Sequence, residues 1–127
     1  MAAVAYLDTH VVAWLYAGQV ELLTDRALRL LRDSDLLISP MVRLELQYLH
    51  EVGRTRAPAH AVIRELASTI GLRVCRLSFG EVVEKAERQS WTRDPFDRII
   101  VAQAAHAGAA LVTKDKTIQQ NYSMAVW

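Results

Sequence analysis

Short apolar runs alternate with amphipathic segments along this chain of 127 residues, and this alternation restricts the possible folds more than any other feature of the sequence. Short apolar runs bounded by turn residues are typical of buried strands, and apolar residues spaced three or four apart are typical of helices. We therefore predict an α/β fold in three layers, with a central, mainly parallel sheet of four or five strands and helices on both faces. The expected strands are residues 4–7, 36–38, 72–77, 109–113 and, at an edge, 124–127. The expected helices are residues 24–31, 40–52, 58–70, 80–89 and 95–106.

Composition narrows the class of protein further. Hydrophobic residues make up 52% of the chain and charged residues 23%, which is typical of a globular protein, and the length fits one domain over residues 1–127. A net charge of +1 excludes a polybasic nucleic-acid binder but allows a local basic rim. The single cysteine, Cys75, excludes internal disulfides, and its apolar neighbours predict a small core residue. Neither a signal peptide nor an apolar run of the ~20 residues that a membrane span needs is found, so we expect a cytoplasmic protein.

Aspartates follow two of the predicted strands at the point where each strand ends. Asp8 comes directly after residues 4–7, and Asp115 follows residues 109–113. In a parallel α/β sheet, ligands bind beyond the carboxyl ends of the strands. The sequence therefore predicts that these two carboxylates lie close together over one edge of the sheet.

Two further acids lie on predicted helices. Glu45 is part of a stripe of positions 41, 45, 48, 49 and 52 that is otherwise apolar, and a buried carboxylate needs compensation. Either it pairs with a neighbouring base such as Arg43, or it faces a site. Asp97 lies three residues after Asp94, where a helix start favours acids for its dipole alone. The alternative is that Asp97 lies at the same rim as the strand-end aspartates.

Convergence of these four carboxylates would favour a bound divalent cation. Two carboxylates ~5 Å apart repel by roughly 3 kcal/mol at an effective dielectric constant near 20. A cation relieves this repulsion at neutral pH, and oxygen ligands without a His or Cys cluster favour Mg²⁺ or Mn²⁺. Basic residues flank the acids, among them Arg98 and Lys114, and are either substrate-binding groups or solvated surface charges. The residues alone thus predict an acidic metal pocket suited to phosphodiester hydrolysis.

Four segments together resemble the PIN-domain ribonucleases, and within them the VapC-type toxins of toxin–antitoxin pairs. The most specific segment is RDPFDRIIVAQA at residues 93–104, which is similar to the third motif of the family. The others are YLDTH at residues 6–10, SPMVRLEL at residues 39–46 and LVTKD at residues 111–115. Their order and spacing extend the resemblance over essentially the whole chain.

The resemblance implies an active site formed by Asp8, Glu45, Asp97 and Asp115 around Mg²⁺ or Mn²⁺. It also implies endonucleolytic cleavage of RNA, a homodimer, and neutralisation by a cognate antitoxin. In the third motif the catalytic aspartate of the family aligns with Asp97, and Asp94 is interpreted as the helix cap.

Several roles stay open at this point. His10 either contacts a carboxylate or the substrate, or caps the first helix. Trp14 and Tyr16 either pack in the core or at a dimer interface, or stack on bases. Thr113 either holds a metal-bound water or a carboxylate, or is a buried strand residue. A non-catalytic PIN scaffold that binds a protein or RNA is the alternative function, whereas a haloacid-dehalogenase-like phosphatase would need an aspartate where His10 stands.

Overall fold

The computed structural model describes residues 3–127, and its centre is a five-stranded sheet in the order β3-β2-β1-β4-β5. All four strand pairings are parallel. The strands are β1 (Ala3–Leu7), β2 (Ser34–Ile38), β3 (Arg73–Val74), β4 (Ala110–Val112) and β5 (Ala125–Val126). The α-helices are α1 (Thr9–Tyr16), α2 (Asp25–Asp33), α3 (Pro40–Glu51), α4 (Ala59–Ile70), α5 (Phe79–Ala86), α6 (Pro95–Ala107) and α7 (Lys116–Asn121), with a 3₁₀ turn η1 (Val20–Leu22).

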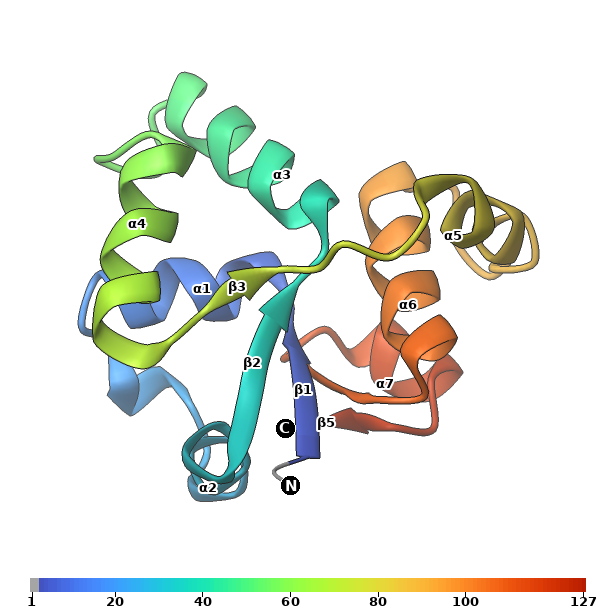
Figure 1. The fold of residues 1–127 in the computed structure, drawn as a ribbon, viewed down its shortest axis with the longest axis horizontal. Coiled ribbons are helices and arrows are strands. Elements are labelled where there is room, and N and C mark those ends of the chain that lie inside the picture. The colour runs from blue at the N-terminus through green and yellow to red at the C-terminus, as the bar shows by residue number, and fades with distance from the viewer. Residues whose placement is uncertain (1–2) are drawn as a thin grey trace.

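The order of the strands determines which helices cover which face. From β1 the chain adds β2 and β3 on one side, and it then returns to add β4 and β5 on the other side. Because parallel crossovers are right-handed, this reversal places α1, α3 and α4 on one face and α5, α6 and α7 on the opposite face (Figure 1). The order in which strands are added to the sheet therefore reverses between β1 and β4. A crevice is expected beyond the carboxyl ends of these two strands.

Local capping signals set the helix starts as the sequence predicts. The Ser39 hydroxyl accepts a hydrogen bond from the first turn of α3, and Pro40 occupies the first position. Asp94 caps α6 in the same way, with Pro95 at the first position. At the other end of α6, Gly108 has φ of 63°, the left-handed conformation that glycine adopts without strain.

The predicted three-layer α/β fold is confirmed, with two local differences besides α1, whose bounds are not among those of the predicted helices. The third strand covers two residues instead of the six expected at 72–77. The Cys75 N–H still donates to the Ile38 carbonyl, but the chain then leaves the sheet towards α5. The second difference is α7, which the sequence analysis did not predict. Its start depends on Asp115, whose carboxylate accepts a hydrogen bond from the Ile118 N–H.

The buried face of α3 also differs from the predicted stripe. Its buried side chains are Val42, Leu46 and Leu49. Tyr48 and Val52, which the stripe placed in the core, are each 52% exposed. Glu45 therefore lies at the border of the buried face and not in its centre, which lowers the cost of keeping its carboxylate charged.

None of the helices in residues 3–127 combines the length and the apolar character needed to cross a bilayer.

Candidate active site

A cavity of about 510 Å³ contains all four acids that the sequence analysis singled out. It is lined by the side chains Asp8, Glu45, Asp94, Asp97 and Asp115, together with His10, Trp14, Lys114 and Lys116. These residues come from the carboxyl ends of β1 and β4 and from the helices α1, α3, α6 and α7. The cavity thus lies where the strand order reverses, as the topology predicts.

Asp8 is the most firmly held of these acids. It is 8% exposed, and its Oδ1 accepts a hydrogen bond of 2.8 Å from the Thr9 N–H. Its Oδ2 accepts a hydrogen bond of 2.7 Å from the Thr113 hydroxyl, which lies at the end of β4. Asp8 therefore caps α1, and the interpretation of His10 as the cap is wrong. Burial raises the pKa of Asp8, and the hydrogen bonds from Thr113 and Thr9 oppose this rise.

Glu45 reaches the cavity from α3 and is held by Thr9. The Thr9 hydroxyl donates a hydrogen bond to Glu45 Oε1, and no ion pair joins Glu45 to Arg43 among the described residues. Burial raises the pKa of Glu45, and the Thr9 hydrogen bond opposes the rise. This role of Thr9 cannot be predicted from the sequence, because a contact between residues 36 positions apart leaves no local signal.

Asp97 lies in the first turn of α6 and differs from its neighbour Asp94. The Asp94 carboxylate accepts hydrogen bonds from the N–H groups of Phe96 and Asp97, at 2.8 and 3.4 Å, so it acts as the predicted cap. No hydrogen bond within residues 3–127 reaches the Asp97 carboxylate. Burial, together with repulsion from the other carboxylates of the cavity, raises the pKa of Asp97 from its usual value of 3.8 to about 7.

Asp115 and Thr113 link the end of β4 to the cavity. The Asp115 N–H donates to the Thr113 hydroxyl at 3.0 Å, and that hydroxyl in turn donates to Asp8. Asp115 also caps α7 through one carboxylate oxygen and leaves the other oxygen without a described partner. Thr113 is fully buried and holds a carboxylate, which decides one of the alternatives that the sequence left open.

The donor set suits a hard divalent cation. All four predicted ligands are carboxylates, and burial plus mutual repulsion raises the pKa of Asp8, Glu45 and Asp97. Within residues 3–127, no three His, Cys, Asp or Glu side chains have the arrangement of a formed metal site. Mg²⁺ usually keeps several waters and takes only one or two carboxylates directly, so a cavity with loosely spaced carboxylates is compatible with it. Asp8, Glu45, Asp97 and Asp115 therefore fit the predicted ion by their chemistry.

The two basic residues proposed for substrate binding lie in different places. Lys114 lines the cavity together with Lys116, and its ammonium group lies 5.7 Å from the centre of the Trp14 ring. Arg98 does not line the cavity, because its Nε donates a hydrogen bond of 2.8 Å to the Thr92 carbonyl. Substrate binding by Arg98 stays a prediction.

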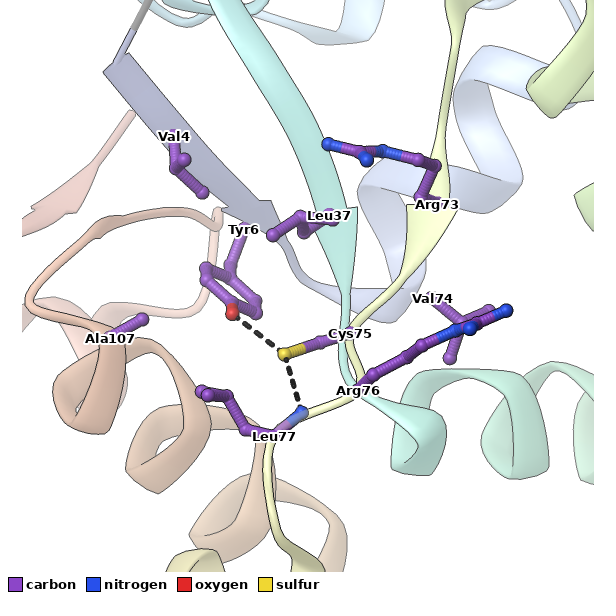
Figure 2. Close-up of a pocket in the computed structure, with 9 residues that line it drawn as sticks. All are labelled: Val4, Tyr6, Leu37, Arg73, Val74, Cys75, Arg76, Leu77 and Ala107. Atoms are coloured by element: carbon purple, nitrogen blue, oxygen red, sulfur yellow. Dashed lines mark hydrogen bonds between the residues drawn. The ribbon is translucent and has the colours of Figure 1, made fainter.

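A second, larger cavity lies away from these acids, beside β1, β2 and β3. It measures about 880 Å³, and no acidic residue is among those that line it (Figure 2). Figure 2 shows the Tyr6 hydroxyl pointing at Cys75, to whose Sγ it donates a hydrogen bond of 2.9 Å. Cys75 is buried, as its sequence neighbours predict.

The fold and the cavity define this chain as a parallel α/β protein whose acids converge where the strand order reverses. The sequence matches the PIN domain family over residues 5–123, and the chain belongs to this family. No curated protein sequence matches it significantly.

Solved structures of the same fold cover nearly all of the chain. VapBC2 from Rickettsia felis bound to a DNA fragment from its promoter is similar with a TM-score of 0.63 and 19% identity over 97% of each chain. A toxin–antitoxin complex from Klebsiella pneumoniae is similar with a TM-score of 0.60 and 17% identity, over 97% of this chain and 96% of that chain. PAE2754 from Pyrobaculum aerophilum is similar with a TM-score of 0.59 and 21% identity, over 99% of this chain and 91% of that chain.

Proposed function

We propose that this PIN domain is a metal-dependent endoribonuclease that acts in the cytoplasm as the toxin of a toxin–antitoxin pair. The observation that carries the proposal is the convergence of four carboxylates from distant parts of the chain in one cavity. Such a cluster lowers the stability of a protein in which it has no function, because each carboxylate is desolvated and repelled by the others. Membership of the PIN family and the similarity to toxin–antitoxin complexes support the same function.

Asp8, Glu45, Asp97 and Asp115 would hold Mg²⁺ or Mn²⁺. A bound ion of this kind neutralises the carboxylates, polarises a phosphoryl oxygen and lowers the pKa of a water molecule. The Thr113 hydroxyl fixes the orientation of Asp8 from one side. The orientation of Asp8 is thus set by the chain itself before any ion binds.

The basic residues of the cavity would bind the substrate. Lys114 and Lys116 lie on the wall of the same cavity as the acids, so a phosphate that enters is attracted by two ammonium groups. Arg98 lies on the same helix as Asp97, next to it in sequence, and we propose that it contributes positive potential from outside the cavity. RNA is favoured by the resemblance of the four sequence segments to the ribonucleases of this family.

Cleavage of RNA by the purified protein tests the proposal. We expect the parent to cleave single-stranded RNA with Mg²⁺ or Mn²⁺, and Asp8→Asn or Asp97→Asn to abolish cleavage. Asparagine caps a helix as well as aspartate does, so Asp8→Asn removes the charge and keeps α1 intact. Asp35→Asn, at an exposed position of β2 outside the cavity, is the matched control. Equal cleavage by all four proteins would refute the proposal, and RNA binding without any cleavage would favour the non-catalytic scaffold.

The proposed antitoxin inhibits by filling the acidic cavity. A protein segment that places an Arg or Lys near Asp8 and Asp97 neutralises the carboxylates and excludes RNA, and an apolar groove next to the cavity would hold the rest of the segment. The gene next to that of this chain is the first candidate for the antitoxin. Full inhibition by an antitoxin that lacks its C-terminal segment would contradict this part of the proposal.

The proposed homodimer has a candidate surface on α3. Leu44, Tyr48 and Val52 are each more than half exposed and follow one another at intervals of four residues, which places them on one side of the helix. A second copy of the chain would cover this stripe. We expect sedimentation analysis to give a dimer for the parent and a monomer for Leu44→Glu, and a monomeric parent would refute the assignment.

A further inference from the structure

A groove of about 710 Å³ continues the acidic cavity across the face of the molecule that carries α1, α3 and α4. His10 and Trp14 line both the groove and the acidic cavity, so the two spaces share one wall. The apolar floor of the groove is formed by Ala13, Ala17, Leu46, Leu49 and Val62. At its far end lie Arg54 and Arg56, in the loop between α3 and α4.

The shared wall offers an aromatic ring in a fixed position. Trp14 is half-buried, and its ring lies 6.0 Å from the ring of Trp127 and 6.0 Å from that of His10, tilted against both. Aromatic neighbours in tilted arrangements restrict the motion of an indole ring. A planar group that passes from the acidic cavity into the groove therefore passes along the wall that His10 and Trp14 form.

The far end of the groove offers two unpaired cations. Arg54 and Arg56 are exposed, and neither forms an ion pair with another residue of the part of the chain described. Their loop is held by hydrogen bonds, since the Arg54 N–H donates to the Leu49 carbonyl at 2.8 Å and His50 bonds the Thr55 carbonyl at 3.1 Å. The two guanidinium groups are thus available to a ligand, on a loop whose backbone is held in place.

We propose that this groove holds single-stranded RNA next to the scissile phosphate, with a base stacked on Trp14 and phosphates bound by Arg54 and Arg56. This inference rests on the proposed function. Proteins bind single strands by combining aromatic stacking with cations along the backbone, and the groove has both. The acids of the cavity repel the phosphates that flank the reacting one, and cations outside the cavity offset this repulsion.

The size of the groove agrees with a short stretch of RNA. From Glu45, in the acidic cavity, α3 continues for six residues to its end at Glu51, a distance of about 9 Å along the helix axis. This length matches about two to three stacked nucleotides at 3.4 Å each. The bound segment therefore includes the nucleotides directly next to the cleaved bond.

Binding measured without cleavage tests the arginines. A fluorescein-labelled single-stranded RNA of mixed sequence is titrated with protein in EDTA, in the Asp8→Asn background. We expect Arg54→Ala/Arg56→Ala to weaken binding roughly tenfold and to reduce the slope of log K against log salt by about 1.4, because each lost phosphate contact accounts for about 0.7. The matched control is Arg29→Ala/Arg32→Ala, which removes two exposed arginines of α2 that do not line the groove.

Two substitutions of Trp14 separate stacking from packing. Trp14→Phe keeps an aromatic face, whereas Trp14→Leu keeps an apolar side chain without one. We expect the leucine variant to bind the RNA about tenfold more weakly and the phenylalanine variant to stay near the parent, since stacking on a base depends on a ring. Thermal melting of both variants identifies any loss of folding, and equal binding by the two folded variants would overturn the role of Trp14.

The outcomes distinguish this inference from the proposed function. If the parent does not cleave RNA but the arginine variant still binds it more weakly than the control, the groove is an RNA site and the nuclease proposal fails. If the arginine variant binds RNA as the control does, the RNA groove is refuted. Weaker binding of the antitoxin by the same variant would then show that the groove holds the antitoxin segment and not RNA.

Discussion

Replacing Asp97 by asparagine is expected to stabilise the metal-free protein while it abolishes cleavage. Asp97 accepts no described hydrogen bond, and burial and neighbouring carboxylates raise its pKa from 3.8 to about 7. A carboxyl group with a higher pKa in the folded state takes up protons on folding, so the stability of the metal-free parent falls as the pH rises from about 4 to about 7. Asparagine carries no charge to be desolvated or repelled and does not respond to this change in pH.

The size of the effect follows from the pKa shift. A rise of about three units in the pKa of Asp97 corresponds to a loss of about 4 kcal/mol in the free energy of unfolding when the carboxylate is charged and unscreened. Asp97 is only partly buried, and water screens its interactions with the other acids, so we expect a gain of about 1–2 kcal/mol in the free energy of unfolding at pH 8. At pH 4.5 the parent carboxyl is protonated in the folded state, and the gain shrinks to about a quarter.

Urea unfolding in EDTA at pH 8 and pH 4.5 measures this difference, with Asp35→Asn as the control. The control removes an exposed carboxylate outside the cavity, and we expect it to change stability by less than about 0.5 kcal/mol at either pH. A loss of stability for Asp97→Asn at pH 8, or a gain of the same size at both pH values, would show that the Asp97 carboxylate is not strained and would refute the reasoning.

Three further predictions concern the acidic cavity and the contact between Tyr6 and Cys75. Thr113→Val removes the hydroxyl that holds Asp8. We expect urea unfolding to show a loss of about 1–3 kcal/mol in the free energy of unfolding, together with weaker cleavage of RNA. Unchanged stability would contradict the role of this hydrogen bond. Mn²⁺ at a hundred times its dissociation constant should stabilise the parent by about 2.7 kcal/mol in thermal melting. The same concentration should leave the stability of Asp97→Asn nearly unchanged. Equal stabilisation of both proteins would place the ion elsewhere. Tyr6→Phe removes the donor to Cys75 and should cost less than about 1 kcal/mol without any effect on RNA cleavage, because this contact lies outside the acidic cavity.

Much of the fold was predictable because its signals are local. The starts of α3 and α6 follow from Ser39-Pro40 and Asp94-Pro95, where the side chain and the ring act on backbone groups within three residues. The third strand was predicted too long, because an apolar run signals burial and Cys75 is buried by a contact with Tyr6 beyond the end of the strand. The helix α7 was not predicted, since only one of its side chains, Ile118, is buried and no apolar periodicity results.

The sequence by itself determined the layered α/β fold, the strand ends at which Asp8 and Asp115 stand, and the two helical acids that accompany them. Only the tertiary structure decided that Thr9 holds Glu45 and that Thr113 holds Asp8, because these pairs are 36 and 105 residues apart. It also decided which face of α3 is buried and that Trp14 forms a wall common to the acidic cavity and the groove. The physical reason is that capping and periodicity act within a few residues, whereas the meeting of distant side chains depends on the order of the strands and on the packing of helices against the sheet.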